Sequence, residues 1–280
     1  MSSPGEFYKS LPPITKAYGT ICFLTTVASQ LGLYRIETIA LIHELVFSEF
    51  QVWRLLTNFF FLGNFSVNFA IRLLMIIRYG VQLEQGPFQR RTADFLWMMI
   101  FGALSLLVLS FIPILRGAFL GISLVFMLVY IWSREFPNAQ VNIYGLVALK
   151  VGIVFLLIVT IFGSASVSAY VTTITQAFYL PWAMLALDVI FGSPLAPDLM
   201  GIIAGHLYYF LTVLHPLAGG RNIIFTPKLV HKLVARARLG YPTNAHVPQD
   251  RATGVAFTGR SYRLNASTGR GFSLRRFWSS

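Results

Sequence analysis

Isolated acids and histidines within apolar sequence are the side chains that could carry chemistry in this chain. In the C-terminal half these candidates are Asp188, Asp198, His206 and His215. A metal site needs several histidine, cysteine or carboxylate ligands at suitable spacing, and the sequence contains no such group. A serine nucleophile needs an adjacent base, and no such pair can be recognised along the chain. From these residues we predict that the chain has no catalytic residue and binds no metal or cofactor.

Three polar residues, Asn64, Asn68 and Arg72, recur every four positions within an apolar run. On a helix this spacing places them on one face. Polar groups at membrane depth normally face protein or a water-filled cavity, because their contact with lipid is costly. The stripe predicts a hydrophilic groove within the membrane. The alternative is that Arg72 snorkels to the surface and the asparagines bond to neighbouring helices.

Trp53 and Arg54 close a loop of mixed composition, residues 34–54, where the next apolar run begins. The loop is too polar to cross a bilayer and too apolar to be free coil, which predicts that it lies in the membrane interface. An indole and a guanidinium at headgroup depth can hold such a loop through the ring N–H and through contacts with phosphates or carbonyl oxygens. We expect this pair to fix the loop; the alternative is an ordinary interfacial anchor.

Gly201 and Gly205 form a G-x-x-x-G motif in the last apolar run, and Gly117 and Gly121 repeat the spacing. Small residues at positions i and i+4 of a helix allow close approach of a second backbone. The motif predicts helix packing, and packing within the chain is favoured over dimerisation.

The elements that must position these residues are apolar helices. Hydrophobic residues make up 56% of the 280 residues, charged residues 11%, and the mean hydropathy is +0.67. A soluble domain carries roughly a quarter charged residues. Runs of about 20 apolar residues suit a helix that crosses a bilayer, where the backbone must satisfy its own hydrogen bonds. The fold class is therefore predicted to be an all-α polytopic membrane protein.

The apolar runs predict a membrane domain over residues 17–216, after a short polar lead over residues 1–16. The expected crossings are 17–33, 55–77, 95–115, 118–132, 143–191 and 199–214. The fifth run is too long for one crossing at 1.5 Å per residue. With six crossings, the joints rich in Lys and Arg fall on the side of the two termini, which places both ends in the cytosol.

The remaining segment, residues 217–280, is a basic tail. From residue 219 onward it has eleven Lys and Arg and one acid. Beside a membrane such a block indicates cytosolic placement and contact with anionic lipid, rather than with nucleic acid. Segment 227–239 is predicted to be an amphipathic helix on the headgroups, with leucines on one face and basic residues on another. Beyond residue 240 the composition predicts disorder.

Several motifs are spread over about residues 6–240. In chain order they are Phe7-Tyr8, Pro12-Pro13-Ile14-Thr15, Trp53-Arg54-Leu55, Phe59-Phe60-Phe61, Leu96-Trp97-Met98-Met99, Trp132-Ser133-Arg134-Glu135, Phe178-Tyr179-Leu180-Pro181-Trp182, 201–206 and Tyr208-Tyr209-Phe210. Together they resemble the motifs of the derlins, the proteolytically inactive branch of the rhomboid superfamily, and of plant derlins in particular. The resemblance implies a rhomboid-like six-helix bundle in the endoplasmic reticulum membrane. It also implies a role in moving misfolded lumenal or membrane proteins to the cytosol, with a membrane-bound ubiquitin ligase complex and with homo- or hetero-oligomers of derlins as partners.

The tail contains a second resemblance. Residues 257–264 look like the SHP box, a peptide that recruits the valosin-containing AAA ATPase. Phe257, Gly259 and Leu264 match the pattern, and Ser261 stands where its second glycine belongs.

The alternative functions are a rhomboid-type intramembrane serine protease and a small-solute transporter. Active rhomboids carry the nucleophile in G-x-S-G; here Ser123 is present, but Leu124 replaces the last glycine. At the position of their catalytic histidine, three residues before the G-x-x-x-G, this chain has Asp198. A serine without its base is a poor nucleophile, so the resemblance implies a pseudoprotease. No inverted repeat of the kind found in transporters is apparent.

The sequence departs from the derlin pattern at residues 151–176, an apolar insertion. We hypothesise that this segment is a short retained intron translated in frame. In the protein it would add a membrane hairpin or a further span.

Overall fold

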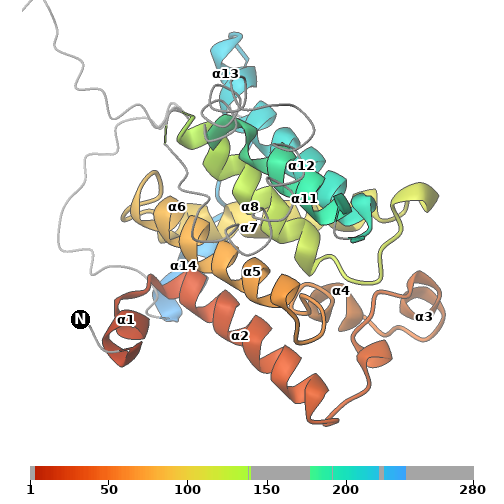
Figure 1. The fold of residues 1–280 in the computed structure, drawn as a ribbon. Helices are drawn as coiled ribbons and strands as arrows, with labels where there is room; N and C mark the ends of the chain where they lie inside the picture. Colours follow the sequence, from red (N-terminus) through yellow and green to blue (C-terminus); the bar gives the residue numbers. More distant parts are fainter. Residues whose placement is uncertain (1–3, 138, 140–176, 191, 221–223, 238–280) are drawn as a thin grey trace, which may run out of the picture.

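The computed structural model describes residues 4–137, 139, 177–190, 192–220 and 224–237. Within these ranges the regular structure is helical (Figure 1). The helices are α1 (Pro4–Ser10), α2 (Pro13–Gln30), α3 (His43–Ser48), α4 (Arg54–Thr57), α5 (Val67–Met75), α6 (Val81–Gln85), α7 (Thr92–Leu109), α8 (Gly121–Glu135), α11 (Leu180–Ile190), α12 (Leu195–Tyr209), α13 (His215–Leu217) and α14 (Lys228–Arg236). The insertion 151–176 and the SHP-like box 257–264 lie outside the described residues.

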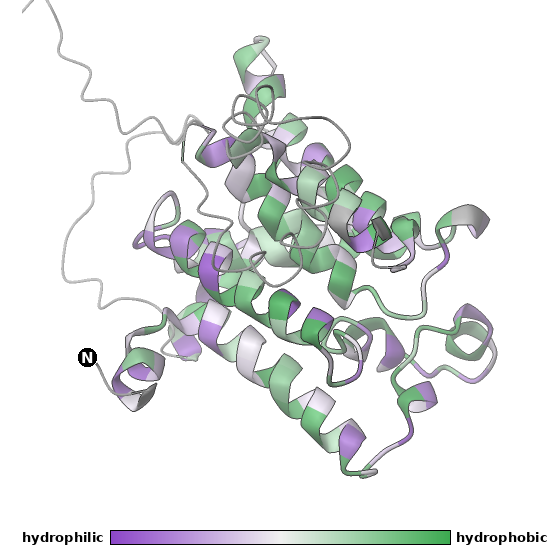
Figure 2. Ribbon diagram, viewed as in Figure 1, coloured by the Kyte–Doolittle hydropathy of each residue, from purple (hydrophilic) through white to green (hydrophobic). Residues whose placement is uncertain are grey.

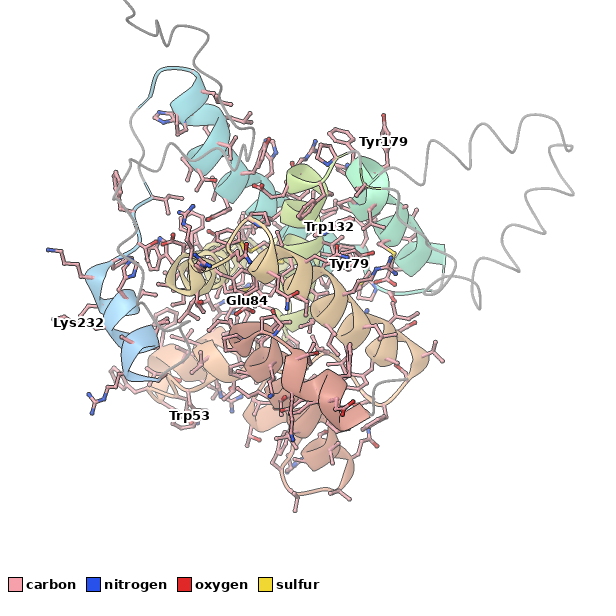
Figure 3. The ribbon with its side chains drawn as sticks, turned by 90° about the vertical axis from the view of Figure 1, so that its left-hand side faces the viewer. Trp53, Tyr79, Glu84, Trp132, Tyr179 and Lys232 are labelled. Atoms are coloured by element: carbon pink, nitrogen blue, oxygen red, sulfur yellow. The ribbon has the colours of Figure 1, made fainter. Side chains whose placement is uncertain are left out.

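Helix α8 is the centre of the bundle. It packs against α5, α7, α11 and α12, and nearly every side chain from Gly121 to Ser133 is buried. A helix that is apolar all round is expected to be surrounded by protein or lipid. The sequence motifs contribute to this core: the Trp132 ring lies 4.7 Å from that of Tyr79 (Figure 3), and the Arg134 guanidinium lies 4.1 Å from the centre of the Phe178 ring.

The outer surface of the bundle is also apolar. Two helical stretches are long and apolar enough to cross a membrane, Thr92–Leu109 and Leu195–Leu217. Apolar residues predominate along α8, α11 and α12, and hydrophilic residues gather at α6 (Figure 2). Large apolar side chains exposed on the bundle include Leu24, Leu74, Leu104, Val108, Ile203 and Leu207. The predicted all-helical fold is confirmed for the described ranges, and the count of six crossings stays a prediction.

The second predicted crossing, residues 55–77, is wrong at both ends. The long helix begins only at Val67, because Gly63 has a φ of +114° and Ser66 is the N-cap. The Ser66 hydroxyl oxygen accepts a hydrogen bond of 3.2 Å from the Phe69 N–H, which satisfies one of the free donors of the first turn. At the other end α5 continues through a π-helical turn, Ile76–Gly80, into α6.

Glu84 of α6 caps the start of α2 from a distant part of the chain (Figure 3). Its carboxylate accepts hydrogen bonds from the N–H groups of Ile14 (3.1 Å) and Thr15 (2.9 Å) and from the Thr15 hydroxyl (2.7 Å). The N-cap residue itself, Pro12, makes no side-chain cap. Because free N–H groups and the helix dipole make a helix N-terminus attract anions, Glu84 joins α6 to α2.

Helix α14 lies against the first half of α7. Val230 and Val234 are buried there against Ala93, and the Thr226 hydroxyl donates to the Asp94 carboxylate. The N-cap residue of α14 is Pro227, which makes no side-chain cap hydrogen bond. The side chain of Lys232 points away from the bundle (Figure 3). Leu229 and Leu233 are also exposed, so the leucine and lysine faces remain available to a membrane surface.

Candidate functional site

Arg54 lies inside the loop that it was predicted to hold. It begins α4 and is only 5% exposed. Its Nη1 donates to the carbonyl oxygens of Glu37 and Ala40, the latter at 2.8 Å, and its Nε donates to the side-chain oxygen of Gln51. One guanidinium thus connects the middle of the loop to its end.

Trp53 takes no part in this network of hydrogen bonds. Its side chain is 53% exposed (Figure 3). Phe50, Val52 and Leu56 beside it are exposed as well. Exposed aromatic and aliphatic residues of this kind are typical of a membrane interface. An interfacial anchor at Trp53 stays a prediction, whereas Arg54 makes the hydrogen bonds within the loop.

We expect Arg54→Lys to loosen the loop although the positive charge is kept. Lysine lacks the planar fork that reaches two carbonyl oxygens at once, and hydrogen bonds from a charged group contribute about 1.5–3 kcal/mol. Hydrogen exchange of the amides of residues 36–41 should therefore accelerate about ten- to a hundredfold. The control is Arg35→Lys, since Arg35 is highly exposed in the same loop. Equal exchange in both variants would contradict this role of Arg54.

Arg72 is the centre of a second cluster, in the interior of the bundle. It is on α5, and its Nη2 lies 3.6 Å from the Asp188 carboxylate of α11. Both side chains are largely buried, at 11% and 15% exposure. Nη1 of Arg72 donates to the Leu62 carbonyl oxygen at 3.0 Å. Arg72 is therefore paired inside the protein and does not snorkel to the surface.

Asp198 of α12 brings a second acid to this cluster. It is 1% exposed and interacts electrostatically with both Asp188 and Arg72. In the described part of the chain, its Oδ2 and the Nε of Arg72 have no hydrogen-bond partner. Three helices thus place two acids and one guanidinium together. Removing one partner of such a group leaves an uncompensated buried charge, which is strongly destabilising.

The predicted stripe is only partly present. Asn68 precedes Arg72 by one turn of α5 and is half-buried, whereas Asn64 lies before the helix and is exposed. The prediction of a common helical face is therefore wrong for Asn64, because α5 starts after the Ser66 cap. The sequence analysis did not predict that Asp188 and Asp198 lie beside Arg72. The only sign of their role in the sequence is that each is a single acid within apolar residues.

Ser123, the residue at the rhomboid nucleophile position, is fully buried in α8. Its hydroxyl has no hydrogen-bond partner among the described residues. His206 of α12 bonds through Nδ1 to the Tyr130 hydroxyl at 2.7 Å, two helical turns along α8 from Ser123. In the same ranges no three histidines, cysteines or acids group together as metal ligands.

The G-x-x-x-G motif of α12 packs against α8 of the same chain. A Cβ at Gly201 would lie 2.3 Å from the Ser123 carbonyl oxygen, and one at Gly205 would lie 2.8 Å from the Tyr130 ring. Such distances are possible only without side chains at these positions. The motif thus brings α12, with Asp198 at its start, close to the central helix.

The described helices expose apolar side chains on the outside of the bundle and pair their ionisable groups between helices in its interior. This arrangement is that of a helical membrane protein. The Der1-like family matches residues 11–171 and 162–228, and the two matches overlap at residues 162–171, within the insertion 151–176. Derlin-1 of Arabidopsis thaliana is 65% identical over 94% of this chain and 99% of its own length. Derlin-1 of Oryza sativa is 57% identical over 95% and 100%, and a probable derlin-2 homolog of Dictyostelium discoideum is 34% identical over 84% of each. The chain belongs to the Der1-like family, which confirms the predicted resemblance to derlins.

Proposed function

We propose that this protein is a non-enzymatic component of endoplasmic-reticulum-associated degradation, which assists the retrotranslocation of misfolded lumenal or membrane proteins to the cytosol. Its membership of the Der1-like family supports the proposal. The observation that carries it is the cluster of Arg72, Asp188 and Asp198. Polar groups inside the bundle lower the cost of bringing peptide amides into the membrane, which is several kcal/mol for each unsatisfied group.

The proposed arrangement is a rhomboid-like bundle of six crossings with both termini in the cytosol. In this orientation the loop held by Arg54 faces the lumen, where clients arrive. The exposed basic face of α14 lies on the cytosolic headgroups. A membrane-bound ubiquitin ligase complex and other derlin copies complete the proposed assembly.

In this proposal the C-terminal tail recruits the AAA ATPase that pulls on the client. Phe257, Gly259 and Leu264 form the SHP-like box, which recruits the valosin-containing AAA ATPase. Some twenty residues of the sequence separate the box from α14, a length of chain that lets the ATPase bind away from the membrane surface.

We expect Phe257→Ala combined with Leu264→Ala to abolish co-purification of the ATPase, because the two apolar anchors of the box are removed. Client proteins should then persist longer, whereas membrane insertion should be unaffected. The matched control is Phe272→Ala with Leu274→Ala, an equivalent apolar pair elsewhere in the tail. Undiminished recovery of the ATPase with the first variant would contradict the role of the box.

A further inference from the structure

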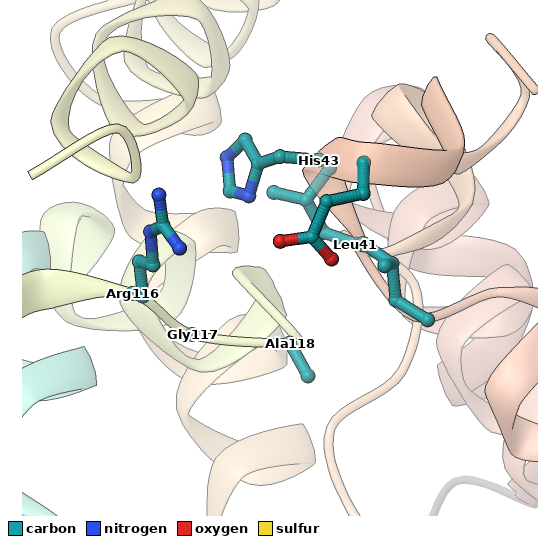
Figure 4. A pocket seen from close by; sticks show the side chains of 7 residues that line it. Leu41, His43, Arg116, Gly117 and Ala118 are labelled. Atoms are coloured by element: carbon teal, nitrogen blue, oxygen red, sulfur yellow. The ribbon is translucent and has the colours of Figure 1, made fainter. Parts of the chain in front are cut away.

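A pocket of about 200 Å³ lies where the loop 34–54 meets the connection between α7 and α8. The two segments are joined at its floor by a 2.8 Å hydrogen bond from the Leu41 N–H to the Ala118 carbonyl oxygen. The side chains of His43 and Arg116 face this pocket from opposite sides (Figure 4). Neither segment belongs to the Arg72 cluster.

Two opposite charges line this pocket without neutralising each other. Glu44 and Arg116 are both exposed to it, and neither forms an ion pair within the described ranges. Partial burial and the Arg116 charge lower the pKa of His43. The imidazole is therefore mostly neutral at pH 7, and Arg116 and Glu44 remain as one positive and one negative group.

A second cavity, of about 190 Å³, adjoins the first and shares His43 with it. It is apolar, and its lining includes Val46, Phe47, Leu107 and Phe111. The cavity lies at the C-terminal end of α7, which ends at Leu109, and the apolar sequence continues to Leu115, next to Arg116. Since a crossing segment leaves the hydrocarbon where its apolar sequence ends, we place the charged pocket at the depth of the headgroups and the apolar cavity at the depth of the first acyl-chain carbons.

We propose that the two cavities together bind one phospholipid with a zwitterionic headgroup, phosphatidylethanolamine, from the leaflet next to the loop. Arg116 holds the phosphate, Glu44 accepts hydrogen bonds from the ammonium group, and the apolar cavity takes the beginning of an acyl chain. Charge-assisted hydrogen bonds of this kind favour an ammonium over choline, which has no N–H to donate. The two volumes together reach the lower end of the range of ~300–1,000 Å³ typical of small-ligand sites. The site goes beyond the proposed retrotranslocation and does not depend on it.

The test uses the full chain in phosphatidylcholine nanodiscs that contain phosphatidylethanolamine with a photoreactive diazirine near the glycerol. We expect labelled peptides from residues 41–47 and 107–118. Arg116→Gln should reduce this labelling about tenfold, the loss of one charge-assisted contact. Arg35→Gln, which removes an exposed charge of the same loop, should leave it unchanged. An excess of soluble glycerophosphoethanolamine should not compete, because it lacks the acyl chain.

Glu44→Gln tests the preference between two lipids, which a misfolded protein would not change selectively. It should lower labelling by phosphatidylethanolamine and keep or raise labelling by phosphatidic acid, which has the phosphate but no amine. The proposal is overturned if Arg116→Gln labels like Arg35→Gln, if Glu44→Gln leaves the preference between the two lipids unchanged, or if the soluble headgroup competes fully.

Discussion

Gly201→Ala should prevent α12 from packing against α8 and leave little folded protein. The added Cβ would lie 2.3 Å from the Ser123 carbonyl oxygen and 2.5 Å from the Phe126 Cβ. No side-chain rotation can move either atom, so the two helices must separate. Overpacking usually costs about 1–3 kcal/mol and occasionally more. We expect the upper end or beyond, a large part of the ~5–15 kcal/mol that stabilises a typical protein. Thermal unfolding of the detergent-solubilised chain measures the effect.

The matched control for this prediction is Gly117→Ala, in the other pair of glycines with the same spacing. There the nearest atom to an added Cβ is 3.8 Å away, an ordinary contact. This variant should unfold at the temperature of the unchanged protein. If Gly201→Ala does the same, the close approach of α8 and α12 does not exist in the protein.

Local sequence signals predicted the helical fold well. The apolar runs predicted at 17–33, 95–115 and 199–214 overlap in large part with α2, α7 and α12 through α13, because apolar composition and helix are linked in a membrane. The start of α5 was missed, since the run continues across Gly63 and Ser66. There a positive φ and a hydroxyl cap outweigh hydrophobicity, and both act over only a few residues.

Contacts between distant parts of the chain could not be predicted. Glu84 caps α2 from 70 residues away, and Asp188 pairs with Arg72 across an even longer separation. In the sequence Asp188 looks like a single acid in apolar surroundings, and Glu84 looks like one polar residue of a joint between apolar runs. Nothing near either residue in the sequence indicates its distant partner. The pocket of Glu44 and Arg116 is hidden for the same reason. The loop position of Arg54 was easier to predict, since its partners lie within 17 residues.

Arg72→Leu should be the most damaging single change in the charged cluster. It leaves Asp188 and Asp198 without a cation in the interior of the bundle, and removing one partner of a buried pair costs about 3–5 kcal/mol. We expect a marked fall in the unfolding temperature and a longer lifetime of a misfolded lumenal client in cells. The exposed pair of Arg35 and Glu37 provides the control, because surface ion pairs contribute at most about 1 kcal/mol.

Arg72→Leu combined with Asp188→Leu and Asp198→Leu separates the two reasons for keeping these charges. Replacing a buried charged group by apolar residues is often neutral for stability, so the triple variant should recover most of the unfolding temperature that Arg72→Leu loses. If the charges serve only to hold α5 and α11 together, client turnover should recover with it. If polar groups are needed along the path of the client, client turnover should stay slow although the variant is stable. The peptide amides of the client would then pass apolar side chains that offer no hydrogen bonds. The proposed function requires the second result, and normal client turnover in the triple variant would refute the role of this cluster.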